Sequence, residues 1–297
     1  NYFQQKNRWS VDGSVSPGPK RTWGNQKFMT SLMGSAYSLK LDKIDRSALR
    51  VMIGLRKYIC SQFKPNVAKA LYDLFKAKNI MDFSMGWGDR LAGFFASQNT
   101  ELYVGVDPRK ENHPIYREQA DYYEGQLTMF ETMKKVDFYC EAAEDFYYDG
   151  YEDTFDIIFT SPPYFNVERY SHDDNQSWVR YKDIDNWNSQ FLHKALDNML
   201  PTLRSGGKLC INISDVYSPS AGKKAWSKIC DPMNDFIQSY GGMEYKGCIG
   251  MEMAKRPNSG GAGTAKDTKQ YTEESLQLAK ETKDKRFCEP IWIWEKK

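Results

Sequence analysis

The stretch MDFSMGWGDRLAGFF, residues 81–95, decides the fold of this chain, because a buried strand ends in it and a helix begins in it. Its apolar start predicts the strand, and the helical spacing of its later apolar residues predicts the helix. Gly86 and Gly88 lie between the two, where glycine lets the backbone approach a ligand and the helix start supplies polarised N–H groups. Asp82 is a candidate acceptor for an amine of that ligand. Taken alone, the spaced glycines also fit an ordinary structural turn.

Strands and helices continue to alternate beyond this stretch. Short apolar runs at 102–106, 136–140, 155–160 and 208–213 predict further strands, and helical patterns separate them. This alternation predicts an α/β fold with a mostly parallel, doubly wound sheet and helices on both faces. In such sheets, ligands bind beyond the carboxyl ends of the strands.

The domain organisation follows from the composition of the remaining segments. Residues 1–43 are rich in Gly, Pro, Ser and aromatic residues, which predicts an irregular N-terminal arm. Two amphipathic helices are expected next, the second opened by Pro65. Residues 44–297 are expected to form a single domain. Within it, the segments 165–186 and 254–286 are candidate insertions for recognising a substrate.

Composition limits the classes of function. The 41 Lys and Arg residues against 39 Asp and Glu give a formal charge of +2, so any contact with a polyanion must be local. No apolar run is long enough to span a bilayer, and no membrane partner is expected. The six cysteines and three histidines lack metal-ligand spacing, which predicts no metal site and a reduced, cytoplasmic setting. The first residue is Asn1 rather than Met, which favours a trimmed or processed start.

Two further strand ends carry candidate cofactor contacts. Asp107 follows Gly88 by 19 residues, close to the roughly 20-residue offset at which a carboxylate binds ribose hydroxyls in dinucleotide-binding folds. An exposed turn aspartate before Pro108 is the alternative. After the third strand, Ala142 and Ala143 are small enough to admit an adenine ring, and Glu144 or Asp145 lies within reach of its amino group. A helix-capping acid explains Glu144 equally well.

The fourth predicted strand ends in Ser161-Pro162-Pro163-Tyr164, a turn that cannot continue a sheet because neither proline donates a ladder hydrogen bond. A rigid turn here aims the Ser161 hydroxyl and the Pro162 carbonyl at one point, and both are acceptors. Two acceptors suit a planar amino group and would free its lone pair for attack on an electrophilic methyl group. Tyr164 is expected to stack on the base that carries the amine.

These motifs resemble those of the S-adenosylmethionine-dependent methyltransferases that act on exocyclic amino groups of DNA bases. The family's signatures are (Asp/Asn/Ser)-Pro-Pro-(Tyr/Phe) and Asp-Pro-Phe-x-Gly-x-Gly. The second reads DFSMGWG at residues 82–88, with Ser84 where the family usually has Phe. The resemblance covers about residues 80–213 and the closing strand. It implies a Rossmann-like class I methyltransferase fold, with a mixed seven-stranded sheet, and S-adenosyl-L-methionine as the cofactor.

The resemblance also implies roles for single residues. The catalytic residues it implies are Ser161, Pro162, Pro163 and Tyr164. The cofactor-binding residues it implies, together with the strand-end analysis, are Asp82, Ser84, Gly86, Gly88, Asp107, Ala143 and Glu144. The serine form of the turn favours cytosine N4 over adenine N6. Methylation at cytosine C5 is disfavoured because it needs a thiolate nucleophile and the chain has no Pro-Cys dipeptide.

DNA is the expected partner, as a flipped base or a single strand, because a base inside a duplex cannot reach such a pocket. Two alternatives stay open. The same chemistry can act on an RNA base or a protein glutamine, or the chain can be a catalytically silent subunit that binds nucleic acid for a partner. The intact turn and Asp107 argue against the silent subunit. A bacterial protein, or one encoded by a phage or plasmid, is expected; nothing in the sequence specifies an oligomeric state.

Overall fold

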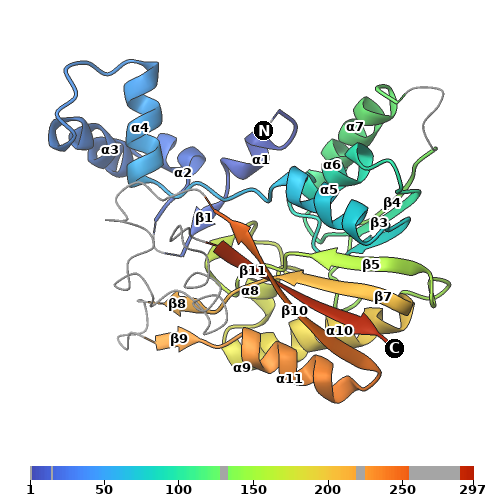
Figure 1. Cartoon of the computed structure of the whole chain (residues 1–297). Coiled ribbons are helices and arrows are strands. Elements are labelled where there is room, and N and C mark those ends of the chain that lie inside the picture. Colours follow the sequence, from blue (N-terminus) through green and yellow to red (C-terminus); the bar gives the residue numbers. More distant parts are fainter. Residues whose placement is uncertain (1, 15, 128–132, 219–224, 254–287) are drawn as a thin grey trace, which may run out of the picture.

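The computed structural model describes residues 2–14, 16–127, 133–218, 225–253 and 288–297. Its centre is a seven-stranded sheet in the order β10-β11-β7-β5-β2-β3-β4 (Figure 1). The strands are β2 Asn79–Asp82, β3 Leu102–Val106, β4 Lys135–Tyr139, β5 Phe155–Thr160, β7 Leu203–Asn212, β10 Met243–Glu252 and β11 Cys288–Lys296. β2, β3, β4, β5 and β7 are parallel, whereas β11 runs antiparallel to both of its neighbours. The predicted fold class, a mixed seven-stranded sheet in an α/β architecture, is confirmed.

Both faces of the sheet are covered by helices. α5 (Pro65–Leu74), α6 (Asp89–Ala96) and α7 (His113–Glu124) lie over one face (Figure 1). The π-helical η2 (Trp187–His193), α10 (Lys194–Met199) and α11 (Cys230–Tyr240) lie over the other. Shorter elements are η1 Lys110–Asn112, η3 Leu200–Thr202, β8 Val216–Ser218 and β9 Ala225–Ser227. The helix predicted to begin within residues 81–95 is thus α6, and the helix opened by Pro65 is α5.

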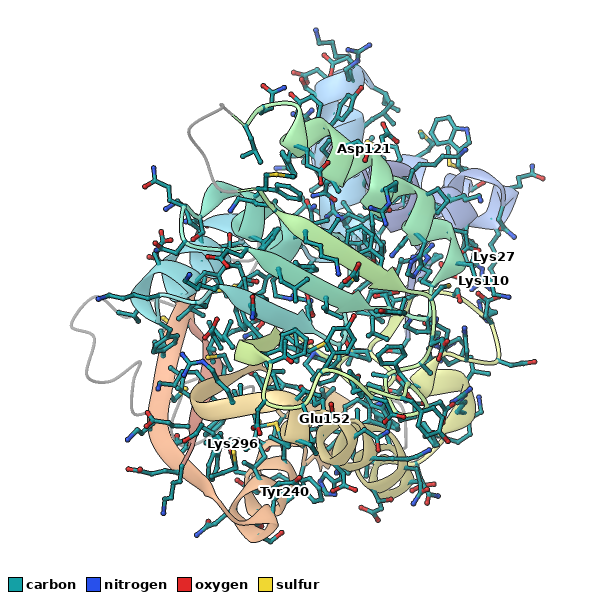
Figure 2. The ribbon with its side chains drawn as sticks, turned by 90° about the vertical axis from the view of Figure 1, so that its right-hand side faces the viewer. Lys27, Lys110, Asp121, Glu152, Tyr240 and Lys296 are labelled. Carbon is teal, nitrogen blue, oxygen red and sulfur yellow. The ribbon has the colours of Figure 1, made fainter. Side chains whose placement is uncertain are left out.

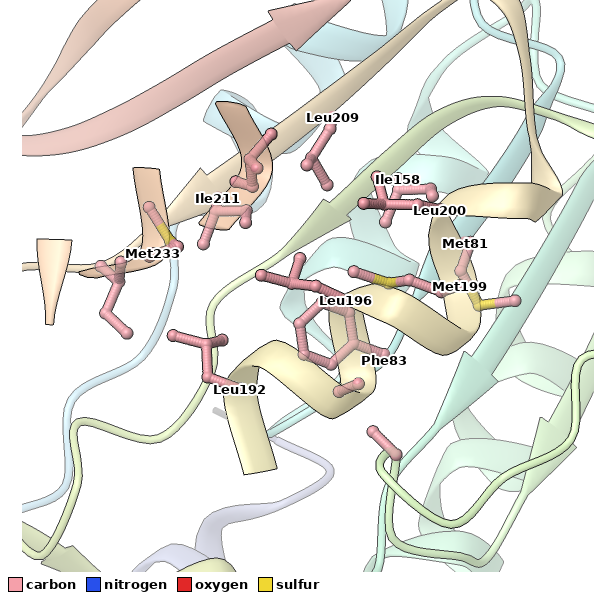
Figure 3. Close-up of a cluster of buried hydrophobic side chains, with 14 of the residues drawn as sticks. Met81, Phe83, Ile158, Leu192, Leu196, Met199, Leu200, Leu209, Ile211 and Met233 are labelled. Carbon is pink, nitrogen blue, oxygen red and sulfur yellow. The ribbon is translucent and has the colours of Figure 1, made fainter. Parts of the chain in front are cut away.

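The core forms two hydrophobic clusters because successive residues of a strand point to opposite faces. In β2, Ile80 packs beneath the first helical layer and Met81 beneath the second, and both are fully buried. Figure 3 shows Leu196 and Met199 of the second layer near Ile158 of the sheet. This double cover holds the parallel strands rigidly, so that the loops at their carboxyl ends are fixed in place.

The N-terminal arm is more regular than its composition predicts. Residues 1–43 contain α1 (Gln5–Arg8), α2 (Pro19–Trp23) and α3 (Gln26–Ser38), which corrects the expected irregular arm. α3 packs against α4 (Arg46–Arg56) around a small core of Leu32, Ala36 and Met52, and this helix pair stands apart from the sheet (Figure 1). Gly and Pro concentrate before α3, whereas the apolar partners that hold α3 come from α4.

The start of the chain is tied to the segment that follows the diproline turn. β1 (Asp12–Gly13) pairs antiparallel with β6 (Glu168–Arg169), and Arg8 is buried and donates from Nη2 to the Cys60 carbonyl at 2.7 Å. The predicted insertion 165–186 contains β6, α8 (Ser177–Arg180) and α9 (Ile184–Asn186). The predicted insertion 254–286 lies outside the described residues. Across the described helices, none has the length and apolarity that crossing a membrane requires.

Candidate active site

Two cavities meet at the carboxyl ends of the parallel strands. The first cavity lies over the ends of β2, β3 and β4. Its atom-free space is about 570 Å³, and the centre of a water molecule can occupy about 60 Å³ of that space. The second cavity lies between the glycine loop, the diproline turn and the end of α4. It is wider: its atom-free space is about 1610 Å³, and the centre of a water molecule can occupy about 480 Å³ of that space. Gly86, Trp87, Ser161 and Tyr170 line both cavities.

Most of the predicted cofactor-binding residues gather at the first cavity. Those that line it are Ser84, Gly86, Asp107, Ala143 and Glu144. They come from three strand ends, which the sheet brings to one edge. Asp82 and Gly88 do not line this cavity. They lie next to residues that line it.

The glycine loop is held by hydrogen bonds from side chains to its backbone. Gly86 and Gly88 have φ values of +59° and +76°, in the left-handed region that favours glycine. The Gly86 carbonyl accepts from Asn112 Nδ2 at 2.9 Å and from the Tyr116 hydroxyl at 2.5 Å. A Cβ on Gly88 would lie 2.2 Å from Gln119 Oε1, so a larger residue there requires the Gln119 side chain to shift. The loop therefore presents the Gly86 backbone to the cavity in one fixed orientation.

Asp107 is the carboxylate best placed to meet a ligand. Its Oδ2 accepts from the Gly86 N–H at 2.9 Å and its Oδ1 from the Arg109 N–H at 3.0 Å. A carboxylate has about four acceptor sites, so two remain for hydroxyl groups in the cavity. Burial raises the pKa of Asp107. Arg109 in turn donates from Nη2 to Ser10 Oγ at 2.9 Å, which holds the N-terminal segment over the same edge.

Asp82 has a different place from the one predicted. It is fully buried, and Arg90 Nε donates to its Oδ2 at 2.8 Å. The Tyr103 hydroxyl donates to the same oxygen at 2.6 Å, and the Ser84 N–H donates to Oδ1 at 3.2 Å. The carboxylate also raises the pKa of Arg90, against the lowering effect of burial. In this geometry Asp82 supports the floor of the first cavity and does not face a ligand amine.

Glu144 is anchored by the segment that was predicted to recognise a substrate. It is 1% exposed, and its Oε1 accepts from Arg180 Nη1 at 3.0 Å and from the Tyr181 hydroxyl at 3.1 Å. Burial raises the pKa of Glu144. The same segment contributes Asn175, Gln176 and Ser177 to the wall of the first cavity. Residues 165–186 thus cover the first cavity.

The diproline turn forms the wall between the cavities. Ser161 lines both, Pro163 lines the first, and Pro162 and Tyr164 line the second. The Ser161 hydroxyl donates to Asn212 Oδ1 at 3.2 Å, so its lone pairs remain available as acceptors. Within the described parts of the chain, no hydrogen bond reaches the Pro162 carbonyl. The turn therefore offers two acceptors at the boundary of the two cavities.

The second cavity has an aromatic wall with a few charged groups. Phe63, Trp87, Tyr164 and Tyr170 line it, a composition typical of ligand cavities. Asp89 also lines it, and burial raises the pKa of Asp89 to about 6. Among the residues that the structure describes, none forms a hydrogen bond with its Oδ2. This cavity can hold a flat ring, with polar atoms at its edge.

Sequence reasoning missed several residues of the site. Asn212 positions Ser161 and donates from Nδ2 to the Pro290 carbonyl at 2.9 Å. It ends β7, so a polar residue at the end of the fifth parallel strand was a usable signal. Trp87, between the two glycines, packs its ring beneath the Arg109 guanidinium at 5.3 Å. Tyr170 gave no signal, because its place depends on the pairing of β6 with β1.

A metal site would need acidic, histidine or cysteine side chains grouped as ligands. In the described residues, no group of three His, Cys, Asp or Glu side chains is placed to hold an ion. The polar groups named above can bind and position a ligand through hydrogen bonds.

Comparison with known proteins gives likeness in fold. No protein-family model matches the chain, and no curated protein sequence matches it. Among solved structures, an S-adenosylmethionine-dependent O-methyltransferase from Thermotoga maritima is 11% identical, with a TM-score of 0.42 over 80% of this chain and 67% of that one. The methyltransferase domain of bacterial CtHen1-C is 9% identical, with a TM-score of 0.45 over 78% and 95%. TrmN from Thermus thermophilus is 12% identical, with a TM-score of 0.42 over 78% and 49%.

Proposed function

We propose that this protein transfers a methyl group from S-adenosyl-L-methionine to the exocyclic amino group of a DNA base, with cytosine N4 favoured over adenine N6. One observation carries the proposal: Ser161, in a turn with the (Ser)-Pro-Pro-Tyr signature, lines two cavities at once. Methyl transfer needs the donor and the amine on opposite sides of one short gap. A wall shared by a narrow and a wide cavity meets that requirement.

The residues of the first cavity fit the cofactor. The two free acceptor sites of Asp107 suit the ribose hydroxyls, and Ala143 leaves room for the adenine ring beside Glu144. The cavity is narrow, and Asn175 and Gln176 line its outer side, where they can contact the bound cofactor. When bound, the cofactor supplies an electrophilic methyl group on its sulfonium.

The residues of the turn fit a planar amino group. The Ser161 hydroxyl and the Pro162 carbonyl each accept one of its N–H bonds, which draws the nitrogen toward tetrahedral geometry and directs its lone pair at the first cavity. Asn212 holds the serine hydroxyl in the orientation that leaves its lone pairs free. Tyr164 lies in the second cavity and stacks on the base.

The test is transfer of a tritiated methyl group to duplex DNA, single-stranded DNA and tRNA in parallel, followed by analysis of the modified nucleoside. We expect label in DNA, as N4-methylcytosine. Ser161→Ala is expected to lower transfer by about 10²–10³-fold, as for loss of one group that stabilises developing charge. Its cofactor affinity, measured by calorimetry, should stay unchanged. Ser239→Ala, on the exposed surface of α11, is the matched control.

Three results would contradict the proposal. If Ser161→Ala transfers the methyl group as fast as the parent, the turn has no catalytic role. If only tRNA is labelled, the substrate is RNA and not DNA. A protein that does not bind S-adenosyl-L-methionine in calorimetry is not an enzyme of this kind, and the catalytically silent subunit then takes its place.

A further inference from the structure

One segment holds the excess positive charge of the chain. Residues 16–64 contain ten of the 41 Lys and Arg residues but only two of the 39 Asp and Glu, so this segment carries +8 and the remaining residues carry −6. It forms α2, α3 and α4 and the connection to α5, and we call it the basic module. The net charge of +2 for the whole chain conceals this separation.

Most charges of the basic module are exposed, and few of them form ion pairs with other described residues. Its exposed basic residues are Lys20, Arg21, Lys27, Lys40, Lys43, Arg46, Arg50 and Arg56. Counting only partners in the described part of the chain, ion pairs form at Arg21, with Asp12 at 3.2 Å, and at Lys43, with Asp45 at 3.3 Å. Repulsion among these like charges raises the free energy of the module when nothing is bound to it. A bound polyanion would relieve this repulsion. In Figure 2, Lys27 lies on the side toward which the arrowheads of the parallel strands point.

On α4 the charges form a stripe that leads to the second cavity. Arg46, Arg50 and Gly54 follow at intervals of four residues and therefore share one face of the helix. Ala48 and Met52 are buried on the other face. Gly54 lines the second cavity, as does Lys57 one turn later. The stripe from residue 46 to 54 is roughly 12 Å long, a length that covers about three to four phosphates of one DNA strand.

We infer that the basic module is a docking surface for the phosphate backbone of a DNA duplex and holds the strand beside the base that enters the second cavity. This inference rests on the proposed function, which places the target base in that cavity. Phosphate contacts fix the position of a duplex and carry no sequence information, so the module grips the DNA without reading it.

The test compares two double charge reversals of equal size. Arg46→Glu with Arg50→Glu removes the stripe. Lys76→Glu with Lys297→Glu is the control, because both lysines are exposed, have no ion pair within the described residues, and lie near the opposite ends of the parallel strands. The probe is a fluorescein-labelled duplex of about 30 base pairs, titrated at several salt concentrations. Circular dichroism checks that each variant is folded.

We expect the stripe variant to bind the duplex at least about tenfold more weakly, and its slope of log affinity against log salt to fall by about two, since each phosphate contact contributes about 0.9. The control pair should match the parent. Arg46→Gln with Arg50→Gln should also weaken duplex binding, by a smaller factor. This pair replaces the double reversal in the test if the reversal disturbs the fold of the module. Cofactor affinity should be unchanged in every variant.

Each outcome decides one of the two proposals. Unchanged duplex affinity and salt slope in a folded stripe variant overturns the docking surface, even if methyl transfer by the parent stands. A parent that binds poly-glutamate as tightly as the duplex, or does not bind the duplex at low salt, also overturns it. A parent that binds the duplex through the stripe but methylates no nucleic acid keeps the docking surface and overturns the proposed function.

Discussion

The two cavities that meet at Ser161 are built in different ways. The first is narrow, and its floor is fixed by a buried ion pair and by backbone hydrogen bonds to Asp107. The second is wide, and its wall joins segments as distant in sequence as Gly54 and Glu289. The difference suggests that one side of the site is preformed for a constant ligand, whereas the other depends on how remote segments pack. Substitutions in each cavity and in the wall between them distinguish these two kinds of construction.

Asp82→Asn should break the floor of the first cavity. It leaves the buried Arg90 guanidinium without its counter charge, and breaking a buried pair in this way costs about 3–5 kcal/mol in the free energy of unfolding. Urea denaturation followed by circular dichroism measures the change. Asp235→Asn, on the exposed surface of α11, should leave stability unchanged. If Asp82→Asn is as stable as the parent, the pair does not support the floor.

Asp107→Asn should weaken cofactor binding and leave the second cavity intact. Losing hydrogen bonds to a charged acceptor costs about 1.5–3 kcal/mol, or roughly 10- to 100-fold in affinity. Calorimetry with S-adenosyl-L-methionine measures it, with the exposed Asp121→Asn of α7 as the control (Figure 2). Duplex affinity should be the same in all three proteins. An Asp107 variant with parental cofactor affinity would remove Asp107 from the proposed site.

Asn212→Ala should act on the wall that the cavities share. It removes the acceptor of the Ser161 hydroxyl, a net contribution of about 0.5–1.5 kcal/mol, so kcat for methyl transfer should fall by up to about tenfold with unchanged cofactor affinity. Asn212→Asp keeps an acceptor and should retain more activity than the alanine variant. Equal losses in both variants would assign the effect to the hydrogen bond from Asn212 Nδ2 to the Pro290 carbonyl, a donor that both variants lose.

Asp89→Asn should have the smallest effect, confined to one range of pH. Burial raises the pKa of Asp89 to about 6 in the folded protein, above about 3.9 when unfolded. The folded state then binds more protons between these values, so stability falls as pH rises from about 4 to about 6. Because Asp89 faces the open second cavity, we expect the asparagine variant to gain only about 1 kcal/mol above pH 6. Melting curves from pH 4 to 8 check this; a difference that persists at pH 4 contradicts it.

Some of the site was predictable because the signals are local. The glycine spacing and the offset to Asp107 predict that the glycine loop and Asp107 lie at the same edge of the sheet. The structure has them there, with the Gly86 N–H donating to Asp107 Oδ2 at 2.9 Å. Asp82 shows where local signals end. Its position at a strand end is visible in the sequence, whereas its partners Arg90 and Tyr103 are chosen by the packing of α6 and β3 against β2. A carboxylate that can meet a ligand and one that is already occupied look alike in the sequence.

The sequence by itself determined the alternation of strands and helices and the rigidity of the diproline turn, because periodicity and the restricted backbone of proline act over a few residues. The tertiary structure decided the pairing of Ser161 with Asn212, the covering of the first cavity by residues 165–186, and the placement of the α4 stripe beside the second cavity. Those contacts depend on which buried faces pack together across long sequence separations. No local pattern specifies that choice.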